Sequence, residues 1–406
     1  MQKRNIKNKF STCKRCLYTT NHPFGLVIDE EGVCSGCRVH EEKDKLDWSE
    51  RWDKLLKLVK EYKSTDPRNY DCIIPVTGAG DSFYITHIVK NKLGLNPLLV
   101  NYNNYYNTPL GIHNLATLRS VFNCDILTMH VNPKSVKKII NTTMRILRSF
   151  HWPAIAGQTV FPVQTALSHK IPLIIWGGHQ GLEQVGMFSH LHEVEMTRRY
   201  RHDHDLMGYE ADDLIQVYDS LTEKDIWQYR YPSNKDIEEI GIRGIYLGNY
   251  IRWDPLAQHK LMVKKFNYKS SHLNRTFDKY DHVDDWFYMN NHDLLKQYKC
   301  GYGKVLDHAC REIRHKRITR EKGQKLVDYY SKQKPLYNDL FCDWLGIDRS
   351  SMNFLLNKNI IDNMEKIKDK QDILDLEDLE KLGFIANDKL ERNHGKKIIN
   401  VGKGHP

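Results

Sequence analysis

Long apolar stretches are missing from this chain of 406 residues. The longest apolar run covers residues 171–178, whereas a membrane-spanning helix needs about 20 apolar residues. The first residues, MQKRNIKNKF, are basic and lack the apolar core of a secretory signal peptide. Internal repeats and low-complexity tracts are missing as well. We therefore expect a cytoplasmic globular protein with no membrane partner.

The composition is that of a folded, basic protein. Hydrophobic residues make up 40% of the chain and charged residues 28%, enough apolar material for two or three domains. Lys and Arg number 61 against 51 Asp and Glu, a net charge of +10, which favours anionic partners such as nucleotides, phosphorylated sugars or nucleic acid. Nine basic and three acidic residues lie between Lys299 and Lys325. That segment is either a solvated helix face, the commoner case, or a patch that faces phosphate.

The cysteines indicate a metal site. Nine cysteines in a reducing compartment are not expected to pair as disulfides. Two C-x2-C pairs separated by seventeen residues can hold one zinc ion in a closed structural site, and their members are Cys13, Cys16, Cys34 and Cys37. An iron–sulfur cluster or redox-active thiols are the alternatives. Because Pro23, Gly25 and Gly32 flank a short apolar stretch between the pairs, we predict a hairpin-like zinc ribbon within residues 1–47.

The middle of the chain alternates between strand and helix patterns. Residues 48–62 have apolar residues at helical spacing, and short apolar runs follow at 70–76, 96–103, 124–131 and 171–178. Helical patterns at 135–150 and 160–168 separate the later runs. This alternation predicts βαβ units and a doubly wound parallel sheet, so we expect an α/β domain over residues 48–250. Polar helical patterns continue over 251–384, including Leu374, Leu376, Leu379 and Leu382, and a flexible basic tail is expected over 385–406.

A glycine-rich turn follows the first strand. Residues 71–82, DCIIPVTGAGDS, read as a buried strand, a turn of small residues and the start of a helix. Such a turn offers main-chain N–H groups and the positive end of the helix dipole to a phosphate, and Thr77 and Ser82 add hydroxyl groups. It matches neither G-x-G-x-x-G nor G-x4-G-K-[ST], since no Lys follows the glycines. Asp81 would repel phosphate, so we expect it to cap the helix or bind Mg2+. The alternative is an ordinary capped glycine turn without a ligand.

This turn and several distant segments resemble a known family. TGAGDS, residues 77–82, is similar to the SGGxDS signature of the PP-loop ATP pyrophosphatases, which attack the α-phosphate of ATP and release pyrophosphate. The paired cysteines and the segments YNTPLGIHNLATLR, HWPAIAGQTVFPVQTA, IPLIIWGGHQGLEQVGMFSH, EVEMTRRYRHDHDLMGYEADDL, RGIYLGNYIRWDP, RTFDKYDHVDDW and HACREIRHKRITRE extend the likeness. Over about residues 10–330 the chain resembles the N-acetyl sugar amidotransferase family of bacterial lipopolysaccharide and O-antigen biosynthesis.

The resemblance implies a Rossmann-like PP-loop fold and a two-step reaction. ATP would adenylate the oxygen of an acetamido group on a sugar, expected to be nucleotide-linked, and pyrophosphate would leave. Ammonia would then displace AMP and give an acetamidino sugar. ATP and Mg2+ are the implied cofactors, beside the structural Zn2+.

The resemblance also implies roles for particular residues. The ATP phosphates would lie against Thr77, Gly78, Ala79, Gly80, Asp81 and Ser82, and the adenosine beside Asn101, Tyr102, Gly177 and Gly178. Candidate catalytic residues are Asp81, Ser82, His179 and Gln180, although a histidine at position 179 is equally well explained as a structural hydrogen-bonding residue. Candidates for the phosphates of a nucleotide sugar are Arg198, Arg199, Arg311, Arg314 and Arg317. The pair His202 and His204 could bind a second metal, but surface polar residues are favoured.

Two positions depart from the family signature. Thr77 stands where Ser is usual and keeps the hydroxyl group. Ala79 replaces a Gly, and if that position needs a positive φ, the strain would be about 1 kcal/mol. The exact geometry of the loop is therefore open.

The source of ammonia is inferred from what the cysteines lack. None of the five cysteines outside the pairs lies in a G-x-C-x-G-like nucleophile turn, so no glutaminase site is visible. We expect a separate glutaminase, as the family's pairing with subunits resembling imidazole glycerol phosphate synthase implies.

Two other functions compete. A tRNA-modifying PP-loop enzyme would adenylate a base carbonyl and would also explain the net positive charge. No isolated cysteine lies beside the loop, however, and the sugar-family segments extend far beyond it, so nucleic acid is not the expected partner. The second competitor is a zinc-containing scaffold that binds nucleotide without turnover.

Overall fold

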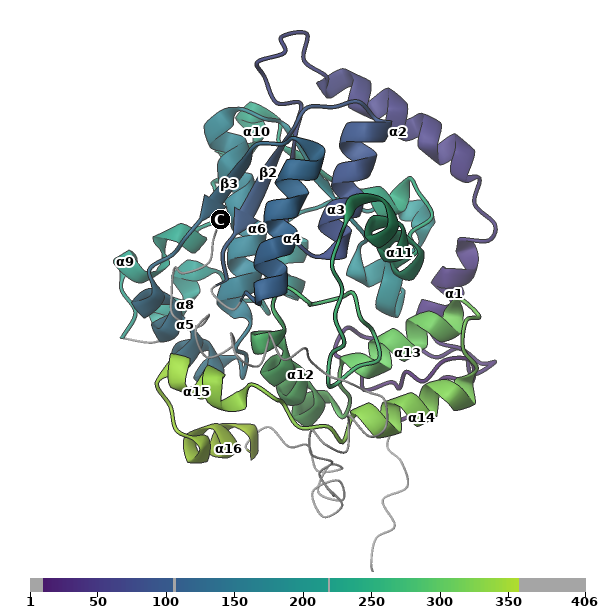
Figure 1. The fold of residues 1–406 in the computed structure, drawn as a ribbon, viewed down its shortest axis with the longest axis vertical. Helices are drawn as coiled ribbons and strands as arrows, with labels where there is room; N and C mark the ends of the chain where they lie inside the picture. Colours follow the sequence, from purple (N-terminus) through teal and green to yellow (C-terminus); the bar gives the residue numbers. More distant parts are fainter. Residues whose placement is uncertain (1–9, 105–106, 218–219, 358–406) are drawn as a thin grey trace, which may run out of the picture.

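The computed structural model describes residues 10–104, 107–217 and 220–357 (Figure 1). At its centre is a five-stranded parallel sheet in the order β3-β2-β1-β4-β5. The strands are β1 (Cys72–Pro75), β2 (Pro97–Tyr102), β3 (Ile126–Met129), β4 (Leu173–Trp176) and β5 (Arg243–Tyr246). In register, Ile73 of β1 lies opposite Leu98 on one side and Ile174 on the other. The α/β class and the four predicted strands are confirmed, whereas β5 was not among the predicted runs.

Helices cover both faces of the sheet, which explains why the strands are mainly apolar. One face is covered by α2 (Trp48–Tyr62), α3 (Gly80–Thr86), its π-helical continuation η1 (His87–Lys92), α4 (Pro109–Phe122) and α11 (Pro255–Phe266). On that face Leu55, Phe83, Leu118 and Met262 share one core. The other face is covered by α5 (Pro133–Ile146), α6 (Trp152–His169) and α10 (Asn234–Ile240).

Short helices lie in the connection between β4 and β5, and one more follows β5 directly. They are η2 (Gly181–Val185), η3 (His190–His192), α7 (Arg198–Tyr200), η4 (Arg201–Asp205), α8 (Ala211–Val217), α9 (Glu223–Ile226), η5 (Trp227–Tyr229) and η6 (Leu247–Asn249).

Within the described residues, only helices follow β5. After α11 come α12 (Trp286–Cys300), α13 (Lys304–Arg314), α14 (Arg320–Tyr330), α15 (Asn338–Leu345) and α16 (Arg349–Asn357). α12 and α15 share a large core with α5 and α6, in which Phe150 packs against Phe341 at a ring distance of 5.1 Å. The predicted leucine-rich segment around Leu374 and the basic tail lie outside the described residues.

The cysteine-rich segment packs on the C-terminal helices. It ends in α1 (Ser35–Glu42), and Figure 1 shows it beside α13 and α14. The four paired cysteines share a core with Leu306 and Cys310 of α13. This segment and α13, nearly 300 residues apart in the chain, therefore form one packed unit.

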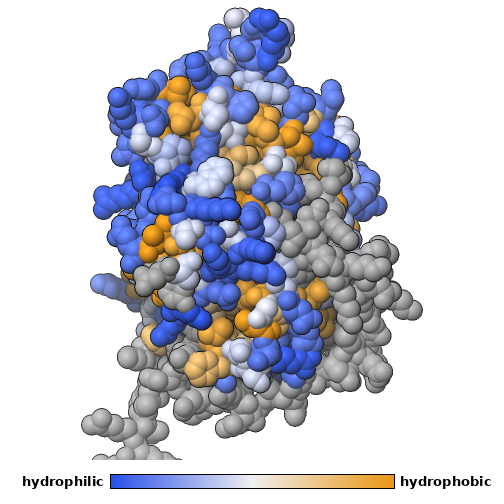
Figure 2. Space-filling view, turned by 90° about the vertical axis from the view of Figure 1, so that its left-hand side faces the viewer, coloured by the Kyte–Doolittle hydropathy of each residue, from blue (hydrophilic) through white to orange (hydrophobic). Residues whose placement is uncertain are grey.

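Among the residues that the structure describes, no helix is both long and apolar enough to cross a bilayer. The face in Figure 2, on the side of α5, α8 and α9, is mainly hydrophilic, and its hydrophobic residues form separate small groups.

Candidate functional site

A polar cleft opens at the carboxyl end of β1 and β4. These strands are adjacent in the sheet, but the chain leaves β1 toward β2 on one side and β4 toward β5 on the other. Such a switch point is where parallel sheets bind ligands. The cleft has a volume of about 310 Å3 and is lined by Thr77, Ala79 and Asp81 after β1, and by Gly178 and Gln180 after β4.

The glycine-rich turn is held by its own hydroxyl groups. The main-chain N–H of Thr77 donates to Ser82 Oγ at 3.1 Å, and that of Ala79 donates to Thr77 Oγ1 at 3.2 Å. Gly78 has a φ of +92°, and a Cβ there would lie 3.1 Å from Leu115. Ala79 has a φ of −70°, so the strain considered for this position is absent. Gly78 is the residue of this turn that requires glycine.

Asp81 lies in the first turn of α3 and contacts a buried histidine. Ala79 is the N-cap and makes no side-chain cap, so Asp81 is not the capping residue. Instead, Asp81 Oδ1 lies 2.8 Å from Nε2 of His259 in α11. Burial lowers the pKa of His259, but the hydrogen bond and charge of Asp81, together with Asp281 and Asp278, outweigh it, so this pKa is raised.

An aspartate-rich loop, with four aspartates over residues 278–285, contributes to the cleft. Asp281, Asp284 and Asp285 line it. Burial raises the pKa of both Asp284 and Asp285 to about 7, and the charge of Asp285 adds to the effect on Asp284. The loop is fixed to the start of α4, because the N–H of Thr108 donates to the carbonyl of Asp284 at 2.8 Å. Asp284 also interacts with the Thr77 side chain, so this loop meets the glycine-rich turn.

Basic residues of α13 also line the cleft, beside the aspartate-rich loop. Lys304, Arg311 and Arg314 of this helix line the cleft. Arg311 pairs with Asp278 and, at 2.8 Å, with Asp281. Asp278, Asp281 and His308 present possible metal-ligand atoms within 4.8 Å of one another, but Arg311 already neutralises both carboxylates. We describe this group as an ion-pair cluster.

The basic segment 299–325 is thus mostly engaged. Besides Lys304, Arg311 and Arg314 in the cleft, Arg317 pairs with Glu312 and Asp254, and Arg320 donates to the carbonyl of Cys16 at 3.1 Å. Lys299 donates to the carbonyl of Arg148 at 3.1 Å. The expectation of a solvated helix face therefore holds for only part of segment 299–325, because many of its basic side chains contact other residues.

The residues expected beside adenosine divide into two groups. Gly177 and Gly178 pack against Trp253, where added Cβ atoms would lie 2.9 and 2.7 Å from the indole. Asn101 is buried and donates to the carbonyl of Val76 at 2.8 Å, which ties β2 to the strand end before the turn. Tyr102 points to the other face of the sheet, where its hydroxyl lies 2.7 Å from that of Tyr229.

Of the two polar residues after β4, only Gln180 lines the cleft. His179 is 1% exposed, accepts the N–H of Gly181 on Nδ1 at 2.9 Å and packs against Phe188, Tyr200 and Tyr246. Burial lowers its pKa to about 4. His179 is therefore a buried structural residue, which was the alternative to a catalytic role.

The remaining candidates lie away from the cleft. Arg198 pairs with Glu210 at 2.5 Å, and the Arg199 side chain is 92% exposed. His202 and His204 each pair with the following aspartate. Of the predicted arginines, the structure brings Arg311 and Arg314 into the cleft.

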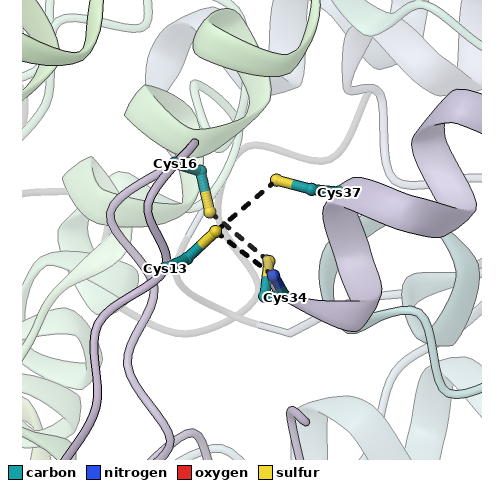
Figure 3. A group of neighbouring side chains, drawn as sticks. All are labelled: Cys13, Cys16, Cys34 and Cys37. Carbon is teal, nitrogen blue, oxygen red and sulfur yellow. Dashed lines mark hydrogen bonds between the residues drawn. The ribbon is translucent and has the colours of Figure 1, made fainter. Parts of the chain in front are cut away.

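The four paired cysteines meet at one point (Figure 3). All four are buried, and the Sγ atoms of Cys13 and Cys37 lie 4.0 Å apart, those of Cys16 and Cys34 3.5 Å apart. Four sulfurs at about 2.3 Å from one zinc ion have tetrahedral edges of about 3.8 Å. The donor set therefore fits a structural Zn2+ ion.

Several cleft residues were not predicted from the sequence. They are Trp253, Asp281, Asp284, Asp285, Lys304 and His308, and behind them His259, which contacts the cleft residue Asp81. The one local signal was the density of aspartates in RTFDKYDHVDDW, four within eight residues, which sequence reasoning used only as part of a resemblance.

Comparison with known proteins addresses the C-terminal part. Residues 274–374 match the family model described as "LPS biosynthesis protein WbpG-like, C-terminal domain". This range contains the aspartate-rich loop and α13, which together form one side of the cleft. No curated protein matches the chain. The match supports a relationship to the proteins of bacterial surface-sugar biosynthesis.

Proposed function

We propose that this protein is an ATP-dependent N-acetyl sugar amidotransferase of lipopolysaccharide biosynthesis. The observation that carries the proposal is the position of the turn 77–82. It lies at the switch point of a parallel sheet and faces a wall contributed by the region that matches the LPS biosynthesis family. A Rossmann-like PP-loop fold would explain both the position of the turn and the wall that it faces.

The reaction exchanges one oxygen for nitrogen. The acetamido oxygen attacks the α-phosphorus of ATP, the bond to the β-phosphate oxygen breaks, and pyrophosphate leaves. Ammonia adds to the resulting imidate carbon, AMP departs with the former acetamido oxygen, and protons are lost to solvent. The products are an acetamidino sugar, AMP and pyrophosphate. Because an amide is a poor electrophile, the enzyme's tasks are alignment, charge neutralisation and exclusion of water.

The cleft supplies groups for these tasks. The amides at the start of α3 face the proposed phosphate position, with Ser82 holding the turn. Lys304 offers positive charge to the departing pyrophosphate, whereas Arg311, which pairs with Asp278 and Asp281, and Arg314 complete this part of the lining. Gly178 and Trp253 line the part of the cleft proposed for the adenosine, and Gln180 lines the space left for the sugar.

Mg2+ fits the acidic side of the same cleft. Asp284 and Asp285 are buried carboxyl groups whose pKa is raised chiefly by burial, so a cation bound beside them would favour their ionised form. Carboxylate oxygens are ligands that Mg2+ prefers. When bound there, Mg2+ would neutralise charge on the phosphates of ATP.

Ammonia would come from a separate glutaminase. Burial raises the pKa of the Cys72, Cys124 and Cys300 thiols, and that of Cys342 to about 11, so these groups are poor nucleophiles at neutral pH. The main alternative, a tRNA-modifying PP-loop enzyme, is less well supported because one side of the cleft comes from the region that matches the LPS biosynthesis family.

The test is product analysis with the full chain, ATP, Mg2+, ammonium and candidate acetamido sugars. We expect AMP and pyrophosphate to form only with sugar present, and mass spectrometry to find NH in place of one oxygen. Ser82→Ala should reduce the rate, whereas Lys235→Ala, an 83% exposed control on α10, should not. Stimulation by tRNA instead of sugar would support the alternative, and ADP as product would contradict adenylation.

A further inference from the structure

An exposed carboxylate in a phosphate-binding turn needs an explanation. Asp81 lines the cleft and its side chain is 45% exposed. If the proposed function holds, the triphosphate of ATP lies against this turn, and a free carboxylate there would repel it. A buried imidazole donates a hydrogen bond to this carboxylate.

His259 lies directly beneath the turn. Its side chain is 1% exposed, and Nε2 lies 2.8 Å from Asp81 Oδ1. A Cβ added to Gly80 would lie 2.4 Å from the imidazole, so the ring packs against the first turn of α3 where any larger residue would displace it. The absence of a side chain at residue 80 is thus what lets α11 deliver this ring.

The other ring nitrogen faces the aspartate-rich loop. His259 Nδ1 has no hydrogen-bond partner and lies 3.7 Å from Asp281 Oδ1. The second oxygen of Asp281 is held by Arg311 at 2.8 Å and His308 at 3.3 Å. Asp278, three residues earlier in the same loop, adds negative charge that raises the pKa of His259.

Aromatic packing fixes the ring between these groups. The rings of Tyr268 and Tyr280 lie 6.3 and 5.7 Å from that of His259, and the Tyr268 hydroxyl donates to the carbonyl of Tyr280 at 2.7 Å. His259 therefore has little freedom to turn away from Asp81.

We infer that His259 is a positioning residue for ATP. It donates a hydrogen bond that holds the Asp81 carboxylate against α11, and it connects the turn to Asp281 of the aspartate-rich loop. A histidine with only a packing role would not need a carboxylate at each ring nitrogen. Here the exposed Asp81 lies at Nε2 and Asp281 faces Nδ1. The inference rests on the proposed ATP site, and it concerns binding of nucleotide, not the chemical steps.

The test is calorimetric titration of the zinc-loaded full chain with α,β-methylene-ATP, which cannot be cleaved between the α- and β-phosphates. His259→Leu removes the donor and leaves the Asp81 carboxylate without this hydrogen bond, so we expect affinity to fall by about tenfold or more. His259→Gln keeps an N–H group that can reach Asp81, and its affinity should stay within about threefold of wild type. The double variant Asp81→Asn/His259→Leu removes the charge as well and should bind more tightly than His259→Leu alone.

Each outcome has a distinct meaning. Equal affinity of His259→Leu and wild type would overturn the inference while leaving the ATP site intact. A double variant no better than His259→Leu would also overturn it, because the charge of Asp81 would then be irrelevant. Thermal melting will show whether His259→Leu folds. If it does not, the test passes to His259→Gln. A loss of affinity of about tenfold or more in folded His259→Gln would overturn the inference, because this variant keeps an N–H donor for Asp81. No binding of the analogue to wild type would refute the proposed function itself.

Discussion

The guanidinium of Arg314 lies 3.6 Å from the Sγ atom of Cys34. The same side chain donates to the carbonyls of Glu183 at 3.0 Å and Gln184 at 2.7 Å. One residue therefore joins the cysteine cluster to the segment after β4 that borders the cleft. Its positive charge also offsets the net negative charge of a zinc ion bound by four thiolates.

The first prediction concerns metal at this cluster. Cys34→Ser should lower the zinc content of the purified protein and its melting temperature, because a structural zinc site contributes directly to folding. Metal analysis and thermal melting measure both effects. Cys124→Ser, a half-buried cysteine outside the cluster, is the control and should retain zinc. Full zinc occupancy in Cys34→Ser would show that the ion, if present, is held elsewhere.

The second prediction compares neighbouring residues of the turn. Gly78→Ala should lower the free energy of unfolding by about 1–2 kcal/mol, because Gly78 has a φ of +92°. Ala79→Gly should relieve nothing, since Ala79 already has a φ of −70°, and should lower stability slightly through the greater freedom of the unfolded chain. Urea denaturation of both variants tests this. A stabilised Ala79→Gly would mean that the turn adopts another conformation.

The third prediction concerns His179 and pH. Burial first, and the charge of Arg201 second, lower its pKa to about 4 in the folded protein. The unfolded state, with a pKa of about 6.5, therefore binds the proton first, and stability falls as the pH is lowered through this interval, by up to about 1.4 kcal/mol per pH unit. His179→Asn keeps an acceptor for Gly181 but cannot be protonated, so its unfolding free energy should fall less steeply between about pH 7 and pH 5. Identical slopes would show that His179 titrates normally.

The fourth prediction concerns Asp284. Asp284→Asn removes a buried carboxylate that we propose as a Mg2+ ligand, so the Mg2+ concentration for half-maximal pyrophosphate release should rise by about tenfold or more. Asp328→Asn, on the exposed side of α14, is the matched control. An unchanged Mg2+ requirement in Asp284→Asn would place the cation elsewhere.

Local patterns predicted the framework of the fold well. The helix at 48–62 and the strands β1 to β4 each have an apolar pattern readable within a few residues. β5 has only the four residues RGIY and two of them, Arg243 and Gly244, are not typical of a buried strand. It becomes a strand because β4 lies beside it, with Ile175 opposite Ile245, and such pairing cannot be read locally.

The site divides in the same way. Turn 77–82 and the cysteine pairs are local signals, and the structure assembles each of them as a compact group. The contact between Asp81 and His259 joins residues 178 positions apart, so only tertiary packing brings them together. His179 is a local signal that was ambiguous. Its position after a strand is compatible with a substrate-binding residue and with a buried structural residue, and in the structure it packs against Tyr200.

The most direct test of the account follows the acetamido oxygen. The full chain is supplied with ATP, Mg2+, ammonium and a sugar labelled with 18O in its acetamido group, and the AMP released is weighed by mass spectrometry. The account predicts that one 18O atom passes to the phosphate of AMP for each acetamidino sugar formed. Unlabelled AMP, with the heavy oxygen still on the sugar or in phosphate, would contradict it.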